Sequence, residues 1–226
     1  MRRLFTTLAL VFLTAPILSG TVLLKGGLVH SGNGGTATVQ DILISENIIV
    51  DVGNNLIIDG NTRVIEVNGL PVTPGLISPM SNLGIVEINA LDVTRDDESD
   101  LLSAGFSIFN AFNPHSTGIP WNRSNGITSA ISTPSASSFP IFGLGSHFVL
   151  DGSLEIKGAR DIAMFGRLGS SYGSRAETLS LLESLLEIGE LAKNKPVEEI
   201  LEMTIADKLE LQAQDIIALG LSLIHI

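Results

Sequence analysis

The sequence contains no cysteine and few basic residues. The absence of cysteine excludes disulfide bonds, thiolate zinc sites and cysteine nucleophiles, so the redox compartment must be judged from other features. Lysine and arginine total 13 against 24 aspartates and glutamates, a formal net charge of -11. A surface of this charge repels polyanions such as DNA, and nucleic-acid binding is therefore disfavoured.

Several short catalytic motifs are also missing. Ser135, Ser137 and Ser138 lie near no Gly-x-Ser-x-Gly elbow, so these serines do not support a serine hydrolase. Gly143-Leu144-Gly145 lacks the third glycine and the following helix of a dinucleotide-binding fingerprint, and we interpret it as a turn. The chain has four histidines, none of them two residues from another: His30, His115, His147 and His225. A histidine metal site would have to converge through the fold, and each histidine is more often a surface or hydrogen-bonded side chain.

The N-terminus has the layout of a secretory signal peptide. A short basic start, Met1-Arg2-Arg3, precedes an apolar run over residues 4–18, and Ser19 and Gly20 offer small residues for cleavage. The alternative is a membrane anchor, but the run is shorter than the roughly 20 apolar residues that span a bilayer. We therefore predict a signal peptide over residues 1–20 and an exported, periplasmic chain with no stable membrane span after cleavage.

Residues 21–70 are rich in β-forming residues. Strands are predicted at 21–30, 39–45 and 63–67, and Glu46-Asn47 is a hairpin signal that leads into a further strand beginning at Ile48. We predict a small antiparallel sheet module that ends near residue 70.

The middle of the chain mixes apolar segments with loops. An acidic segment over residues 92–100 contains Asp96, Asp97, Glu98 and Asp100. Their spacing is not that of a calcium loop, so we predict a solvated acidic loop in preference to a cation site. Residues 113–152 predict short strands, at 126–132 and 148–150, between long loops.

Helical patterns appear only towards the C-terminus. Ser174 begins a capping box with Glu177, and leucines at helical spacing continue to about Lys193. Pro196 suits the first turn of a second helix through Met203, a short strand can follow at 209–213, and another helix can begin at Asp215. Helices that alternate with strands favour an α/β fold with a parallel β/α arrangement.

A small β-module followed by Val72-Thr73-Pro74-Gly75-Leu76-Ile77 resembles the amidohydrolase superfamily, in particular its imidazolonepropionase-like exported proteins. The resemblance implies a composite β-sandwich, begun by residues 21–70 and completed by the C-terminus, around a metal-dependent TIM barrel that begins within residues 71–220. It further implies a divalent metal such as zinc and a small-molecule or peptide-like substrate.

The sequence departs from this family where the first metal ligands are expected. The family usually continues Pro-Gly-Leu-Ile with Asp-x-His-x-His, whereas Met80 and Asn82 occupy the two histidine positions here. A thioether is a soft, weak ligand and a carboxamide oxygen is a neutral one, so neither replaces an imidazole on zinc. No metal ligand is therefore assigned within the sequence.

Further residues resemble a set that recurs in the exported proteins of the family: 84–87, 113–116, Ile119-Pro120, Arg123 and 126–128. From this set Glu87, His115 and Arg123 are the candidates for a pocket. A carboxylate could accept a proton or hold a metal, and a guanidinium could clamp a carboxylate. The alternative is a Glu–Arg pair that only orders the loops.

The last six residues, 221–226, resemble the translation of a transposon end used in sequencing libraries, and we expect the natural reading frame to continue past Gly220. Residues 78–220 are fewer than the roughly 250 of a complete barrel, so we expect later strands to carry the remaining ligands. Two functions stay open. The first is an amidohydrolase-like hydrolase of carbon–nitrogen bonds other than peptide bonds, and the second is a catalytically inactive binding or structural relative.

Overall fold

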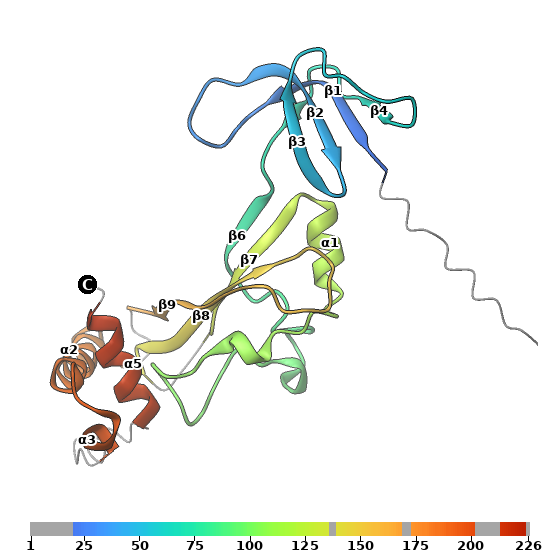
Figure 1. Cartoon of the computed structure of the whole chain (residues 1–226). Helices are drawn as coiled ribbons and strands as arrows, with labels where there is room; N and C mark the ends of the chain where they lie inside the picture. The colour runs from blue at the N-terminus through green and yellow to red at the C-terminus, as the bar shows by residue number, and fades with distance from the viewer. Residues whose placement is uncertain (1–19, 136–138, 169–172, 202–212, 225–226) are drawn as a thin grey trace, which may run out of the picture. The chain divides into compact units, whose positions relative to one another are not determined.

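The computed structural model describes residues 20–135, 139–168, 173–201 and 213–224. The chain divides into two compact units, Met1–Pro74 and Gly75–Ile226 (Figure 1). The predicted signal peptide lies almost wholly outside the described residues. In the parts of the chain that are described, no helix is both long and apolar enough to cross a membrane.

The first unit is a five-stranded sheet in which β1 is central. The order is β3-β2-β1-β4, and β5 also pairs with β1. The strands are β1 (Val22–Val29), β2 (Thr38–Ser45), β3 (Ile48–Gly53), β4 (Arg63–Glu66) and β5 (Pro71–Val72). The four longer strands confirm the sequence-based predictions.

The pairing directions differ from the prediction. β1–β2 and β2–β3 are antiparallel, as expected, but β4 and β5 run parallel to β1. The prediction of a purely antiparallel module was therefore wrong. Local hairpin signals do not indicate that the chain after β3 crosses back to the far side of β1.

The β2–β3 hairpin is explained by its two turn residues. Glu46 and Asn47 both adopt positive φ, 51° and 63°. Two consecutive left-handed residues match the right-handed twist of the flanking strands, the condition for a tight two-residue hairpin. Leu23 and Ile42 are the buried hydrophobic residues of this sheet.

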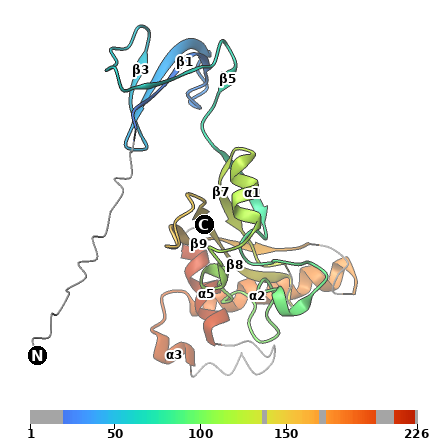
Figure 2. The same ribbon diagram turned by 90° about the vertical axis from the view of Figure 1, so that its right-hand side faces the viewer.

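The second unit contains a four-stranded sheet with the order β6-β7-β8-β9. Its strands are β6 (Leu76–Ser81), β7 (Ile127–Ser132), β8 (Ile141–Val149) and β9 (Gly158–Gly166). β6 and β7 are parallel, and the short helix α1 (Gly118–Ser124) lies between them in the chain and beside β7 in space (Figure 2). β8 and β9 continue the sheet in antiparallel fashion. The predicted parallel β/α arrangement is thus present in one pair of described strands.

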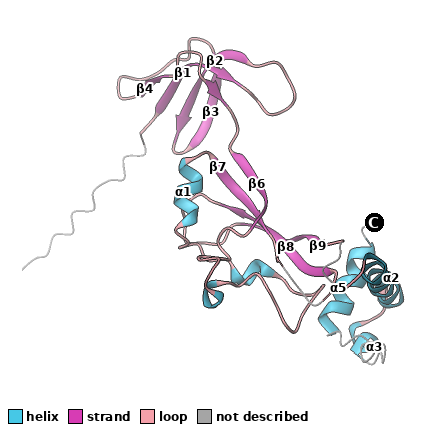
Figure 3. Cartoon of the chain, turned by 180° about the vertical axis from the view of Figure 1, so that it is seen from behind, coloured by secondary structure: helices cyan, strands magenta, loops and turns pink. Residues whose placement is uncertain are grey.

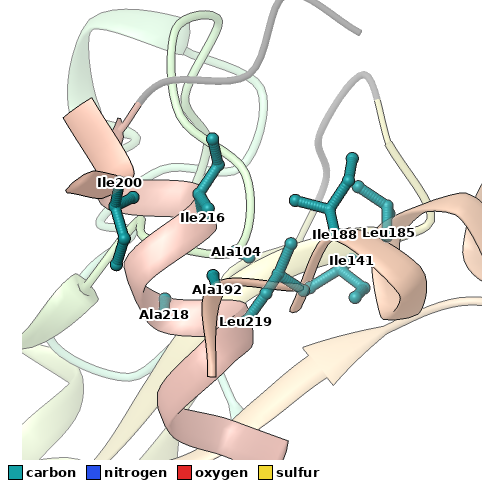
Figure 4. Packing of buried hydrophobic residues seen from close by; sticks show 9 residues of the cluster. All are labelled: Ala104, Ile141, Leu185, Ile188, Ala192, Ile200, Ile216, Ala218 and Leu219. Atoms are coloured by element: carbon teal, nitrogen blue, oxygen red, sulfur yellow. The ribbon is translucent and has the colours of Figure 1, made fainter. Parts of the chain in front are cut away.

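Two hydrophobic clusters pack on this sheet. One surrounds Phe148 and Ala130 of the strands with residues of the 83–119 segment, among them Ile85, Ile108, Phe112 and Ile119. The other joins Ile141 of β8 and Ala104 to the C-terminal helices (Figure 4). It fixes the helices against one end of the sheet.

The C-terminal helices are α2 (Arg175–Ala192), α3 (Val197–Leu201) and α5 (Ala213–Ile224), and α2 packs against α5 (Figure 3). The predicted N-cap of α2 is confirmed, because Ser174 Oγ accepts a hydrogen bond from Glu177 N at 3.1 Å. The strand predicted at 209–213 falls mostly outside the described residues, and Ala213 begins α5. Residues 221–224, which belong to the tail that resembles the translation of a transposon end, continue α5.

Candidate functional site

The carboxyl ends of β6 and β7 are the natural place for a site, since ligands bind at this edge of parallel strands. The two ends are joined by a hydrogen bond from Thr133 N to Ser81 O, 2.9 Å long. Ser132, fully buried at the end of β7, donates its hydroxyl to Leu83 O at 2.7 Å. The edge is therefore well ordered by its own polar groups.

Met80 and Asn82 lie at this edge. Met80 is 72% exposed and has a left-handed backbone with φ of 53°, next to an irregularity in the β6–β7 register between Ser78 and Ser81. Asn82 Nδ2 donates to Asn89 Oδ1 at 3.2 Å. A non-glycine residue with positive φ costs roughly 1–2 kcal/mol, so the end of β6 is locally strained.

These residues do not fit a divalent metal. Met80 offers only a thioether, and the amide of Asn82 is tied to another asparagine. Within the described ranges, no three histidine, aspartate or glutamate side chains come together as metal ligands do. A zinc ion prefers imidazole, thiolate or carboxylate ligands in a tetrahedral arrangement. The end of β6 therefore supplies no recognisable half of a metal centre.

Glu87 joins two loops. Its Oε1 accepts from Asn113 Nδ2 at 3.0 Å, and its Oε2 accepts from the buried Ser116 hydroxyl at 3.1 Å. The same loops are also held by a backbone bond from Asn113 N to Gly84 O, 2.6 Å long. Both carboxylate oxygens are thus occupied by the fold, which indicates a structural role for Glu87.

His115 is an exposed residue of the second of these loops. Its backbone nitrogen donates to Asn113 Oδ1 at 3.0 Å, which closes a turn around the loop. His115 thus lies in the chain between Asn113 and Ser116, the two hydrogen-bond partners of Glu87.

Arg123 serves a different part of the unit. Its Nη1 donates to Leu150 O at 3.4 Å. The guanidinium also packs on Gly152, where a Cβ would stand 2.3 Å from Nη1. Arg123 therefore holds the β8–β9 connection against α1. Glu87 and Arg123 each order a loop, as the alternative from the sequence expected. They do so through different partners and not as a Glu–Arg pair.

Other residues that resemble the recurrent family set make local packing contacts. Gly84 contacts the ring of Phe112, and Leu76 N donates to Gly126 O at 2.8 Å. A Cβ on Gly75 would stand 2.0 Å from Thr128 Oγ1, so the Pro-Gly entry to β6 requires glycine. Among the apolar members of the set, Ile85 and Ile119 belong to the first hydrophobic cluster of this unit, and Val86 and Ile127 pack against it.

A polar cluster that was not predicted from the sequence joins residues 95–98 to Ser135, which follows β7. Arg95 Nη2 lies 3.3 Å from Asp97 Oδ2 and 2.5 Å from Glu98 Oε1, and Ser135 Oγ donates to the same Glu98 oxygen at 3.2 Å. Asp97 is only 2% exposed. The prediction of a solvated acidic loop was therefore wrong for Asp97, although Asp96, Glu98 and Asp100 are exposed. The arginine two residues before Asp97 was the available signal.

The pair with shifted ionisation lies in the β8–β9 connection. Lys157 Nζ donates to Asp151 Oδ2 at 2.7 Å, and this bond, with bonds from Ser153, lowers the pKa of Asp151 from 3.8 to about 2. The same contact raises the pKa of Lys157 above its usual value. Both side chains are exposed, so the pair is screened by salt.

Comparison with known proteins shows what this fold is similar to. No protein-family model and no curated protein matches the sequence. An amidohydrolase from Thermotoga maritima MSB8 superposes with a TM-score of 0.65 at 17% identity, over 88% of this chain and 54% of that one. The chain thus shares the fold of this amidohydrolase and spans about half its length.

Two further solved structures match smaller parts of the chain. A prolidase complexed with N-methylphosphonate-L-proline matches at a TM-score of 0.36 and 23% identity, over 50% of this chain and 25% of that one. A D-hydantoinase matches at a TM-score of 0.30 and 25% identity, over 50% of this chain and 20% of that one. Scores this low do not establish a common fold.

Proposed function

We propose that the protein is an exported, amidohydrolase-like hydrolase that cleaves carbon–nitrogen bonds other than peptide bonds in a small-molecule or peptide-like substrate. The observation that carries this proposal is the fold shared with the amidohydrolase over most of the chain. Fold alone does not determine chemistry, so the site must be tested directly.

The architecture we propose is a composite β-sandwich, begun by the first unit, and a TIM barrel that begins with β6. The parallel β6–β7 pair supports this, because βα units with parallel strands are the repeating element of such barrels. In that arrangement the substrate would lie at the carboxyl ends of the strands, next to Ser81 and Ser132.

A divalent metal such as zinc is implied by the proposed family. Because Met80 and Asn82 do not fit it, we propose that its ligands come from outside the described residues. In this proposal Glu87 and Arg123 are positioning residues: they order the loops beside the strand ends through Asn113, Ser116 and Leu150.

The second candidate is a catalytically inactive relative that retains the fold for binding. The specific observation in its favour is the exposed, left-handed Met80 with its neighbour Asn82 bonded to Asn89 at the end of β6. This end of the strand is built from groups that neither bind metal strongly nor transfer protons.

Hydrolysis of acylated amines distinguishes the two. The protein expressed from its complete gene should release primary amine from a panel of N-acyl amino acids, and a strong chelator should abolish the release. Amine release that persists after chelation would contradict metal dependence. A metal-free protein that releases no amine would support the inactive relative.

Export is tested separately by cell fractionation. We expect the protein in the periplasmic fraction, with an N-terminus that follows residue 20. A chain that begins at Met1 and stays with the cytoplasmic fraction would contradict this part of the proposal.

A further inference from the structure

The sequence contains three Asn-Gly steps, and the structure places them in different environments. They are Asn33-Gly34, Asn68-Gly69 and Asn125-Gly126, and the three asparagines are exposed. An Asn-Gly step is chemically special because glycine has no Cβ to keep its backbone nitrogen from the side-chain amide carbon of the preceding asparagine.

Two of the glycine nitrogens are engaged by the fold. Gly69 N donates to Gly26 O at 2.6 Å, and Gly126 N donates to Arg123 O at 3.0 Å. The amide of Asn125 is held as well, since its Nδ2 donates to Trp121 O at 2.8 Å. For these nitrogens to attack a neighbouring carbonyl, a backbone hydrogen bond must first break.

The third glycine nitrogen differs. Among the hydrogen bonds of residues 20–135, none uses Gly34 N. Gly34 has φ of 81°, and a Cβ built on it would meet no atom within 4 Å. The step lies in the exposed connection from β1 to β2, where water and hydroxide have access.

The side-chain carbonyl of Asn33 is polarised by two donors. Ser31 Oγ donates to Asn33 Oδ1 at 2.6 Å, and Gly35 N donates to the same oxygen at 3.0 Å. Donors aimed at a carbonyl oxygen make its carbon more electrophilic and stabilise the negative charge that develops when a nucleophile adds. The loop therefore combines an unengaged nucleophile with an activated electrophile.

We propose that Asn33 is a site of spontaneous deamidation. Hydroxide removes the proton of Gly34 N, and the nitrogen forms a bond to Asn33 Cγ. The Cγ–Nδ2 bond then breaks, and ammonia leaves after it takes a proton from water. Water opens the resulting cyclic imide at Cγ to give aspartate, or at the backbone carbonyl to give isoaspartate. The net reaction consumes one water and releases one ammonia, with no oxidant or reductant.

The product changes the β1–β2 connection. It adds a negative charge to a chain that already carries a formal net charge of -11. Isoaspartate also lengthens the backbone by a methylene group within the turn that Asn33 Oδ1 closes. This reaction is independent of the proposed hydrolase activity, because all its residues belong to the first unit.

Peptide mapping tests the proposal, because trypsin separates the three steps. Cleavage after Lys25, Arg63, Arg95, Arg123 and Lys157 places them in peptides 26–63, 64–95 and 124–157. The purified protein is incubated in mildly alkaline buffer, and tandem mass spectrometry measures the conversion of each asparagine against a zero-time digest. We expect Asn33 to convert about tenfold faster than Asn68 or Asn125.

Matched variants test the cause. Ser31→Ala should slow conversion of Asn33 by about fivefold, whereas Ser31→Thr, which keeps the hydroxyl, should retain most of the rate. In strong denaturant the three rates should converge, which shows that the fold sets the difference. Equal rates in the folded protein, or equal rates in the two Ser31 variants, would overturn the proposal.

Discussion

The Cα atom of Gly84 lies against the ring of Phe112, so closely that a Cβ on Gly84 would stand 2.4 Å from Phe112 Cε2. The ring has little room to retreat, because it stacks on Phe148 with 3.9 Å between centroids. Gly84 also has φ of 78°, a conformation that favours glycine. This contact anchors the loop that carries Glu87.

We predict that Gly84→Ala lowers the free energy of unfolding by about 2–4 kcal/mol, from backbone strain and overpacking together. Urea denaturation measures the change. Gly60→Ala is the control, since a Cβ there meets no atom within 4 Å, and it should change stability by less than about 1 kcal/mol. Similar effects of the two variants would show that Phe112 does not confine Gly84.

Arg95 is predicted to stabilise the fold mainly by neutralising Asp97. Arg95→Ala leaves a carboxylate that is only 2% exposed without its cation, and we expect a loss of about 3 kcal/mol. The double variant Arg95→Ala/Asp97→Asn should recover part of that loss, because the buried charge is gone.

The exposed pair Lys25–Glu66 is the matched control for Arg95. Its side chains are both 52% exposed, so Lys25→Ala should cost less than about 1 kcal/mol. A double variant of the Arg95 pair that is no more stable than Arg95→Ala would show that Asp97 is not a buried charge.

Local features of the fold were predictable from the sequence, and long-range ones were not. Glu46-Asn47 specifies its hairpin because turn geometry depends on the two residues themselves. β9 was missed because Gly158–Gly166 lacks the run of β-branched residues that marks a strand, and it is a strand only through its pairing with β8. The parallel placement of β4 likewise depends on β1 and not on its own residues.

The candidate site shows the same division. The sequence identified Met80 and Asn82, and the structure places them at the carboxyl end of β6. Glu87 and Arg123 were selected for their chemistry, but their partners are amide, hydroxyl and carbonyl groups that spacing does not indicate. The burial of Asp97 was missed because an acidic run predicts solvent exposure unless its cation is considered with it.

The ionisation of Asp151 provides a test by pH. Lys157→Ala should raise the pKa of Asp151 from about 2 towards 3.8, and the bonds from Ser153 should keep it below 3.8. In the wild type the stabilising contribution of Asp151 is present above its unfolded pKa and is lost as the pH falls through about 2. NMR titration of the Asp151 carboxyl carbon measures its pKa in both proteins. High salt should reduce the difference between the two pKa values, because the pair is exposed. An unchanged titration in Lys157→Ala would contradict the assigned cause.

Histidines placed at positions 80 and 82 should not create a metal site. We predict that Met80→His/Asn82→His alone does not create tight zinc binding, because an imidazole ligand needs partners that orient it. The variant also loses the Asn82–Asn89 bond that orders this edge. Zinc titration followed by calorimetry should show no high-affinity site beyond that of the wild type. A new site of high affinity would show that the end of β6 is already organised for metal.

The hydrolase that we propose depends on a divalent metal held away from the end of β6. The metal content of the protein from the complete gene tests this directly, measured by mass spectrometry after extensive dialysis for the wild type and for Met80→Ala/Asn82→Ala. We expect about one equivalent of tightly bound divalent metal, or more, in both proteins. Metal lost only from the double variant would place the centre at β6, and a wild type without metal would contradict the hydrolase.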